Sequence, residues 1–144
     1  MRTIATVGGL GHSPITPGTL GSAVGLGISW LLGVHPLYQV GGCLIAAVLG
    51  FWSSGPTAKA LGKEDPSCVI IDEVAGMMIA LAALPLTWPV YLGAFLLFRF
   101  LDVVKPGPIN AIQRLPGSWG IMLDDLLAGL AANLLIRLFI VLRS

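Results

Sequence analysis

Charged residues are scarce in this chain of 144 residues: they make up 10% of it, whereas a soluble domain carries roughly 25%. Hydrophobic residues make up 56%. So little charge cannot give a globule a surface suited to water, which excludes a water-soluble domain. The 8 basic and 7 acidic residues nearly cancel, so no strongly basic face is available for a nucleic-acid backbone. The composition indicates a membrane protein that does not bind nucleic acid.

Cysteine is scarce as well. Cys43 and Cys68 have no companion Cys or His at the spacing of a zinc site, and we expect them toward opposite membrane faces, so we expect no structural disulfide. The first 17 residues lack the continuous apolar core and cleavage pattern of a signal peptide, and we expect them to be mature protein. Without internal repeats or long connections, the chain is expected to form one domain over residues 1–144.

Five apolar stretches follow one another along the sequence. Each is near the length that crosses about 30 Å of hydrocarbon as a helix, although the first and fourth are short. The alternating pattern of a membrane β-strand is absent, so we expect helices, with Pro56 at a boundary and only Pro85 inside one. The fold class predicted is an all-α polytopic membrane bundle of about five apolar helices, preceded by a Gly/Pro-rich interfacial segment. The stretches are 19–34, 38–54, 69–88, 90–104 and 120–142.

The positions of Lys and Arg predict the orientation of these helices, because cytoplasmic loops retain positive charge. With the N-terminus in the cytoplasm, only Arg137 and Arg143 lie on the outer side. The turns near Pro36 and Pro89 are then external, and the C-terminus lies outside. The basic residues on the inner side are Arg2, Lys59, Lys63, Arg99, Lys105 and Arg114.

Five carboxylates fall on the cytoplasmic side in this topology. Carboxylates in a membrane are costly, at roughly 2.5 to 3.5 kcal/mol each at the centre of a helix and less near an interface, and they indicate a functional site. Because they come from three helices of alternating direction, their common depth suggests one site rather than five local ion pairs. The acids are Asp72 and Glu73, Asp102, and Asp124 and Asp125.

A divalent cation would compensate this negative charge. Oxygen ligands without His or thiol favour Mg2+, or Mn2+, over zinc or copper. Arg99, Asp102 and Lys105 recur at three-residue spacing near one helix end, which presents cations for phosphate beside a metal ligand. Gly76 lies four residues after Asp72, and Gly129 lies four residues after Asp125. Small residues at this helical spacing would let the helix backbones approach closely and bring the acids together.

The N-terminal Gly/Pro-rich segment, residues 9–22, leads into a helix with Thr19 and Ser22 near its start. Helix starts can bind phosphate, but the lysine of a Walker loop is missing. The signatures of cysteine, histidine and aspartyl-phosphate phosphatases are also missing. By elimination, a metal-activated water is the favoured nucleophile.

Four segments resemble the motifs of bacterial phosphatidylglycerophosphatase A, in the same order and through most of the chain. That resemblance implies Mg2+-dependent conversion of phosphatidylglycerophosphate to phosphatidylglycerol in phospholipid biosynthesis. It also implies a multi-pass protein of the bacterial inner membrane with its active site on the cytoplasmic face. The segments are SPITPGTLGS at 13–22, DEVAGMMIA at 72–80, FRFLDVVKPGPI at 98–109 and GIMLDDLLAG at 120–129.

The combined pattern leads to a hypothesis for each site residue. Arg99 and Lys105 would grip phosphate oxygens, and Thr19 and Ser22 would complete the phosphate cradle. Either Glu73 or Asp125 would take the proton of the attacking water. The residues expected to hold Mg2+ are Asp72, Glu73, Asp102, Asp124 and Asp125.

Two other functions remain open at this stage. A phosphatase for another lipid phosphate, such as an isoprenoid phosphate, would use the same site. A cation-binding or cation-transporting membrane protein would instead place its acids at several depths across the membrane, whereas here they share one face. The membrane lipid substrate is the partner expected from the main hypothesis.

Overall fold

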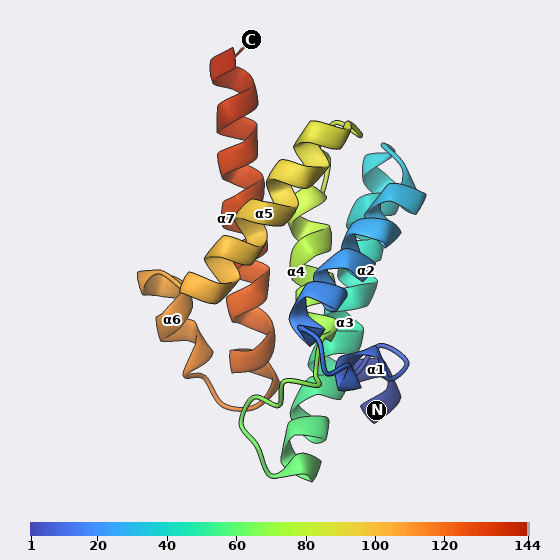
Figure 1. Cartoon of the computed structure of the whole chain (residues 1–144), viewed down its shortest axis with the longest axis vertical. Helices are drawn as coiled ribbons and strands as arrows, with labels where there is room; N and C mark the ends of the chain where they lie inside the picture. The colour runs from blue at the N-terminus through green and yellow to red at the C-terminus, as the bar shows by residue number, and fades with distance from the viewer. Residues whose placement is uncertain (144) are drawn as a thin grey trace.

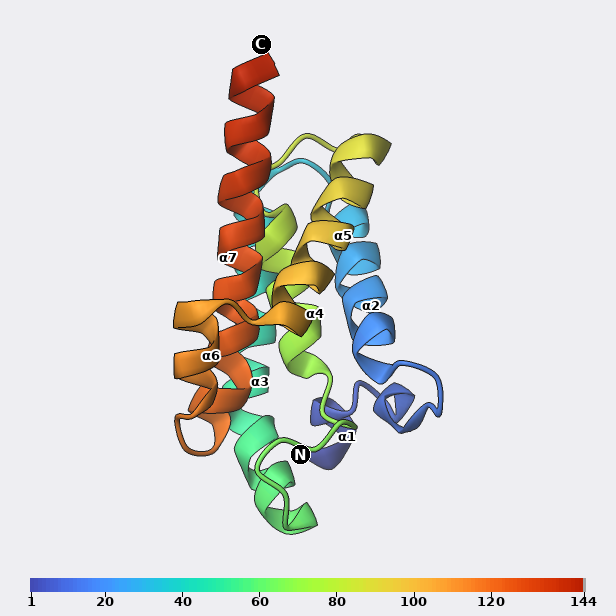
Figure 2. The same ribbon diagram turned by 60° about the vertical axis from the view of Figure 1, so that its left-hand side comes forward.

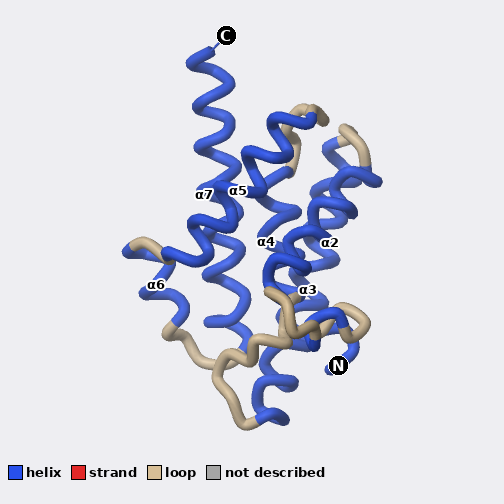
Figure 3. Tube along the Cα trace, viewed as in Figure 1, coloured by secondary structure: helices blue, strands red, loops and turns tan. Residues whose placement is uncertain are grey.

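The computed structural model describes residues 1–143, and within them it contains seven α-helices, one short 3-10 helix (η1) and no strand. Figure 3 shows this all-helical composition, which confirms the predicted class. The apolar stretches correspond to α2, α3, α4, α5 and α7. The bounds are α1 Arg2–Ala5, η1 Leu10–His12, α2 Pro17–Leu32, α3 Pro36–Leu61, α4 Ile71–Leu81, α5 Trp88–Val104, α6 Gly107–Gln113 and α7 Ser118–Arg143.

The long helices alternate in direction, so the chain begins and ends at opposite ends of the bundle (Figure 1). α4 lies in the middle and packs against α2, α3, α5 and α7. One end, called the near end below, holds α1, residues 62–70, α6 and the start of α7 (Figure 2). The other, called the far end, holds the turns at residues 33–35 and 82–87. The near end therefore gathers the starts of α2, α4 and α7 and the end of α5.

Several predicted helix limits were wrong. The stretch 69–88 is not one helix, because α4 ends at Leu81 and residues 82–87 form a turn. Pro85 lies in that turn, since a residue before proline avoids helical backbone angles. Pro56 lies inside α3, which continues to Leu61 and is braced there by the Gly55 amide donating to Ser118 Oγ at 2.8 Å. Parts of the predicted loops are helical, as α1, η1 and α6.

The lengths of the helices limit what can cross a membrane. Among the described residues, α3 and α7 are long and apolar enough to span one, whereas α4 has 11 residues. The prediction of five apolar membrane helices is therefore not confirmed. The short helices nonetheless lie beside the long ones in the same bundle.

The exterior of the bundle is apolar, unlike that of a soluble protein. Large apolar side chains cover its outside; Leu31 is 85% exposed and Leu37 is 70% exposed. Polar side chains lie inside it, including Ser22, Gln39 and Asn133. An apolar exterior over buried polar groups is suited to lipid rather than to water. The chain is therefore a membrane protein.

Glycine lets α4 approach its neighbours backbone to backbone. A Cβ added at Gly129 of α7 would lie 2.1 Å from the carbonyl oxygen of Gly76, and one added at Gly76 would lie 2.6 Å from that of Asp125. On the other side, a Cβ at Gly25 of α2 would lie 2.6 Å from the carbonyl oxygen of Val74. The close approach predicted for Gly76 and Gly129 is confirmed.

Side-chain amides and a guanidinium close the far end from inside. Asn133 Nδ2 donates to the carbonyl oxygens of Ile79, Ala80 and Ala82 at 2.9–3.1 Å, so it caps the end of α4. Arg137 Nη2 donates to the carbonyls of Ala82 and Ala83, and its Nε donates to Asn133 Oδ1 at 2.7 Å. Both residues therefore have a structural role at the end of α4.

Gln39 of α3 joins the two far-end turns to each other. Its Nε2 donates to the carbonyl of Gly33 at 2.6 Å, and its Oε1 accepts from the amide of Ala83 at 2.5 Å. The side chain is 2% exposed. The α2–α3 and α4–α5 turns are therefore fixed relative to one another by one buried amide.

The crossing of α4 and α7 predicts a large difference between two Gly→Ala substitutions. Gly129→Ala should lower the free energy of unfolding by about 1–3 kcal/mol, because the new methyl group must push the backbone of Gly76 away. Gly41→Ala in α3 meets nothing within 4 Å and should raise stability by about 0.5–1 kcal/mol through helix propensity. Denaturation in detergent measures both, and equal stability of the variants would contradict the close crossing.

Candidate active site

The first turn of α4 carries Asp72 and Glu73, where carboxylates interact favourably with the positive end of the helix. The N-terminal segment holds this turn in place. The amide of Ile70, which precedes α4, donates to the carbonyl of Ala5 at 2.9 Å. Gly11 packs so closely that an added Cβ would lie 1.9 Å from the carbonyl oxygen of Cys68. The beginning of the chain therefore positions the acids of α4.

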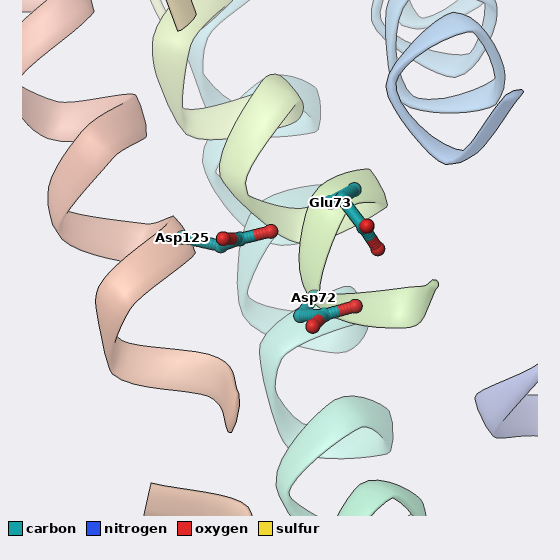
Figure 4. Close-up of side chains that lie close together, drawn as sticks. All are labelled: Asp72, Glu73 and Asp125. Atoms are coloured by element: carbon teal, nitrogen blue, oxygen red, sulfur yellow. The ribbon is translucent and has the colours of Figure 1, made fainter. Parts of the chain in front are cut away.

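Asp125 reaches the same point from the second turn of α7. Figure 4 shows its carboxylate directed at α4, beside the carboxylates of Asp72 and Glu73. One oxygen from each of the three residues lies within 4.8 Å of the other two. We call these three residues the acid triad. Two helices that are distant in sequence thus bring three of the five predicted metal ligands together.

Each carboxylate of the triad has one buried oxygen that lacks a hydrogen-bond partner within the described structure. Asp72 is 7% exposed and Asp125 is 3% exposed, while Glu73 is half-buried. Asp72 Oδ1, Glu73 Oε2 and Asp125 Oδ2 accept no hydrogen bond within the described structure. Buried carboxylates without partners are costly unless something compensates their charge. Three converging hard oxygen donors fit a divalent cation such as Mg2+.

The other two predicted ligands form ion pairs. Asp102 accepts a hydrogen bond from Arg99 Nη1, three residues earlier in α5. Asp124 accepts one from Lys105 Nζ at 2.5 Å, and its second oxygen accepts the amide of Asp125 at 3.0 Å. The carboxylates of Asp102 and Asp124 therefore hold Arg99 and Lys105 beside the triad.

Lys105 lies directly after the end of α5, and its backbone is in the left-handed region at φ 46°. Burial lowers the pKa of its ammonium group. The hydrogen bond and negative charge of Asp124, together with the charges of Asp125 and Asp102, outweigh that effect and raise the pKa above its ordinary value. Lys105 is therefore a cation at neutral pH.

The start of α2 also packs against the triad, where Gly18 lies beside Glu73. A Cβ added at Gly18 would lie 2.5 Å from Glu73 Oε1 and 3.2 Å from Arg99 Nη1. Of the predicted phosphate-binding residues, Thr19 follows Gly18, and its amide donates to the carbonyl of Thr16 at 3.0 Å. Ser22 is fully buried, and its hydroxyl donates to the carbonyl of Gly18 at 2.9 Å. Gly18, rather than Ser22, forms the wall of the site.

Sequence reasoning missed two features of the structure, of which the first borders the triad. Gly18 carries no chemical signal, and only its place one turn before Gly21 and Ser22 hints that this face of α2 is packed. Ser54 and Thr57 of α3 are buried, and their hydroxyls have no hydrogen-bond partner within the described residues. Their signal was a small polar cluster, Ser53, Ser54 and Thr57, at the end of the apolar stretch 38–54.

A cavity of about 520 Å3 opens elsewhere at the near end, between the end of α3 and the loop joining α6 to α7. Lys59, Lys63, Glu64 and Asp65 line one side of it, and Arg114 lies on the other. The triad does not line this cavity. Its lining carries charges of both signs, which is typical of a solvated surface, and we assign it no chemistry.

These features define a membrane protein with a buried carboxylate site at one end of a helical bundle. Comparison with known proteins then identifies it further: the chain belongs to the phosphatidylglycerophosphatase A family, whose model matches residues 3–140. It is therefore a phosphatase. No solved structure matches the chain.

Three relatives illustrate the range of the family. A phosphatidylglycerophosphatase A of Escherichia coli (strain K12) is 38% identical over 125 residues, covering 84% of this chain and 72% of its own. One of Haemophilus influenzae is 37% identical over 128 residues, covering 83% and 76%. A Bacteroides thetaiotaomicron protein, provisionally named a phosphatidylinositol-3-phosphatase, is 36% identical over 142 residues, covering 92% and 89%.

The contact between α2 and the triad predicts the effect of one methyl group. Gly18→Ala should lower the rate of phosphate release by about 10- to 100-fold, because the methyl group displaces the Glu73 carboxylate from the triad. Gly27→Ala, in the same helix and with nothing within 4 Å, is the matched control and should retain full activity. Full activity of Gly18→Ala would mean that the position of Glu73 does not matter.

Proposed function

We propose that the protein is a Mg2+-dependent lipid phosphomonoesterase that hydrolyses phosphatidylglycerophosphate to phosphatidylglycerol and phosphate. The observation that carries this proposal is the buried acid triad, whose unpartnered oxygens converge at the end of the bundle that also holds Arg99 and Lys105. The names of the Escherichia coli and Haemophilus influenzae relatives support the choice of substrate.

Asp72, Glu73 and Asp125 would hold the metal ion. All three offer carboxylate oxygens, and the described residues place no His or Cys among them, which favours Mg2+ over softer metals. When bound there, Mg2+ supplies a Lewis acid that polarises the phosphoryl group and neutralises the charge that develops on it. The carboxylates fix its position.

The side chains around the triad account for the remaining steps. Glu73 or Asp125 accepts the proton of the attacking water, whose oxygen forms the new bond to phosphorus. The bond from phosphorus to the glycerol oxygen breaks, and that oxygen gains a proton as phosphatidylglycerol leaves. Arg99 and Lys105 orient the phosphoryl oxygens through charge-assisted hydrogen bonds.

Asp102 and Asp124 position these two cations. Because each already accepts a hydrogen bond from Arg99 or Lys105, the ion pairs support a positioning role more strongly than a place among the metal ligands. Their coordination of Mg2+ remains a prediction, as does the contact of Thr19 and Ser22 with phosphate. Substitution of each of these four residues tests its role.

The lipid substrate also implies a place in the cell. Phosphate at the headgroup level would arrive at the near end, while its acyl chains lie along the apolar exterior. The near end carries Arg2, Lys59, Lys63 and Arg114 in addition to the site cations, which favours the cytoplasmic side. The proposed location is the inner membrane of a bacterium, with several membrane passes and the N-terminus in the cytoplasm.

Phosphate release by the purified protein in micelles tests the proposal directly. Phosphatidylglycerophosphate should be hydrolysed with Mg2+ and not after EDTA treatment, because the triad loses its compensating charge and the Lewis acid is removed. Activity should return when Mg2+ is added back. Release that is insensitive to EDTA would exclude the metal mechanism.

A panel of phosphomonoesters in the same assay tests the substrate. The comparison set is phosphatidylinositol 3-phosphate, an isoprenoid phosphate and a water-soluble phosphomonoester, the first suggested by the name of the Bacteroides relative. Phosphatidylglycerophosphate should give the highest kcat/KM. Preference for another lipid would keep the site and change the pathway, whereas no hydrolysis of any lipid would favour a cation-binding protein.

Substitution within the triad tests its role separately. Asp125→Asn should lower kcat by about 100- to 10,000-fold, since it removes a metal-binding charge and one candidate base. Asp65→Asn makes the same chemical change in the exposed loop before α4 and should leave activity within a few-fold of the parent. Thermal unfolding in detergent verifies that both variants are folded. An active Asp125→Asn variant would remove this residue from the proposed site.

A further inference from the structure

A groove of about 450 Å3 lies between α5 and α7, toward the far end of the bundle. Figures 1 and 2 both show the start of α5 leaning away from α7. The α5 wall of the groove contains Pro89, Val90 and Gly93, and the α7 wall contains Ile136 and Phe139. None of these side chains is polar. The groove, called the α5–α7 groove below, therefore fits a hydrocarbon chain.

Gly93 leaves the space between the two walls open. A Cβ added at this position would lie 3.5 Å from Ile136 Cδ1, which is an ordinary contact. Any longer side chain at position 93 would therefore extend into the groove. The width of the groove depends on this one residue of α5.

A cation lies beside one end of the groove. Arg143 contributes to its lining. Side chains on a helix tilt toward its N-terminus, and the guanidinium carbon of Arg143 lies 5.4 Å from the centre of the Phe139 ring, a cation–π distance. Arg143 forms no ion pair or hydrogen bond with another described residue. The apolar groove thus has at its end a positive charge that can bind an anion.

The far end offers this cation no acidic partner. Asp125 of α7 lies about 27 Å from Arg143 along the helix axis. The other acids of the chain also lie in segments of the near end. An anion bound at Arg143 therefore comes from another molecule. The seven acids are Glu64, Asp65, Asp72, Glu73, Asp102, Asp124 and Asp125.

The charges of the far end distinguish two occupants of an apolar groove in a membrane. A second copy inserted in the same direction would bring its own Arg137 and Arg143 to this end and no acid, so that like charges would meet. A phospholipid brings a phosphate at the headgroup level and an acyl chain below it. Basic side chains at a membrane surface attract lipids of net negative charge. The charges therefore favour an anionic phospholipid.

We propose that the α5–α7 groove binds an acyl chain of an anionic phospholipid, whose headgroup phosphate pairs with Arg143 at the far interface. The acyl chain fills the space that opens between the start of α5 and the end of α7. Because the groove lies at the end of the bundle opposite the acid triad, this lipid is not the substrate of the proposed reaction. It is a bound component of the folded protein.

Photo-crosslinking in proteoliposomes tests this site. Phosphatidylglycerol and phosphatidylcholine analogues with a diazirine in the same acyl chain supply an anionic and a zwitterionic lipid, each at the same low concentration in a phosphatidylcholine bilayer. Mass spectrometry of peptides measures the labelling of residues 88–93 and 136–143, relative to residues 44–48 of α3, where Leu44 is 61% exposed. The phosphatidylglycerol analogue should label the groove segments about 3- to 10-fold more than the phosphatidylcholine analogue, because a basic residue at the surface attracts it.

Substitutions separate the charge from the groove. Arg143→Gln should abolish the preference for phosphatidylglycerol, whereas Arg143→Lys keeps the charge and should keep the preference. Gly93→Leu fills the groove and should lower labelling by both lipids several-fold. Gly41→Leu in α3, where an added Cβ meets nothing within 4 Å, is the matched control and should leave the labelling unchanged.

Equal labelling of the groove segments by the two lipids, or an unchanged preference in Arg143→Gln, would overturn the proposal. Protection of these segments from both lipids in a dimeric protein would also overturn it, and would assign the groove to a second copy. Since labelling reports binding and not turnover, an inactive phosphatase with the expected labelling would refute the proposed function and leave this inference standing.

Discussion

The backbone contacts of α4 are the constraint on which the rest of this structure depends. α4 is short, yet it carries two of the three triad carboxylates. It is held against α7 where Gly76 and Gly129 remove the side chains between the two backbones, and against α2 at Gly21 and Gly25. Side chains as short as aspartate can meet across helices only when the backbones come this close. The site is therefore a consequence of how tightly three helices pack.

Some of this arrangement was predictable from sequence because it follows from period and direction. Helices that alternate in direction bring the start of one beside the end of the next, so the five acids had to share an end of the bundle. Glycines four residues after Asp72 and Asp125 indicated the close crossing. The helix limits were harder to predict from sequence. Pro56 lies inside α3 because Gly55 is held by a hydrogen bond to Ser118, a residue 63 positions farther along the chain.

The different roles of the five acids could not be predicted from the sequence and became clear only from the structure. Spacing alone placed Asp102 and Asp124 on equal terms with the triad, because all five lie at a similar depth. Their difference arises from side-chain direction: Asp102 meets Arg99 of its own helix, and Asp124 meets Lys105 across to α5. Gly18 was invisible for a related reason, since its role is to have no side chain beside Glu73.

The order in which the triad is completed has a consequence for synthesis. Asp72 and Glu73 are made more than fifty residues before Asp125, the residue of α7 that completes the triad. Ala5, made before α4, accepts a hydrogen bond from the segment that precedes α4. A growing chain can thus seat α4 early, but its carboxylates wait for their third member until α7 enters the bundle. Any chain cut short before α7 leaves an acidic pair inside an apolar protein without the residue that completes their cation site, and buried charge of that kind is costly.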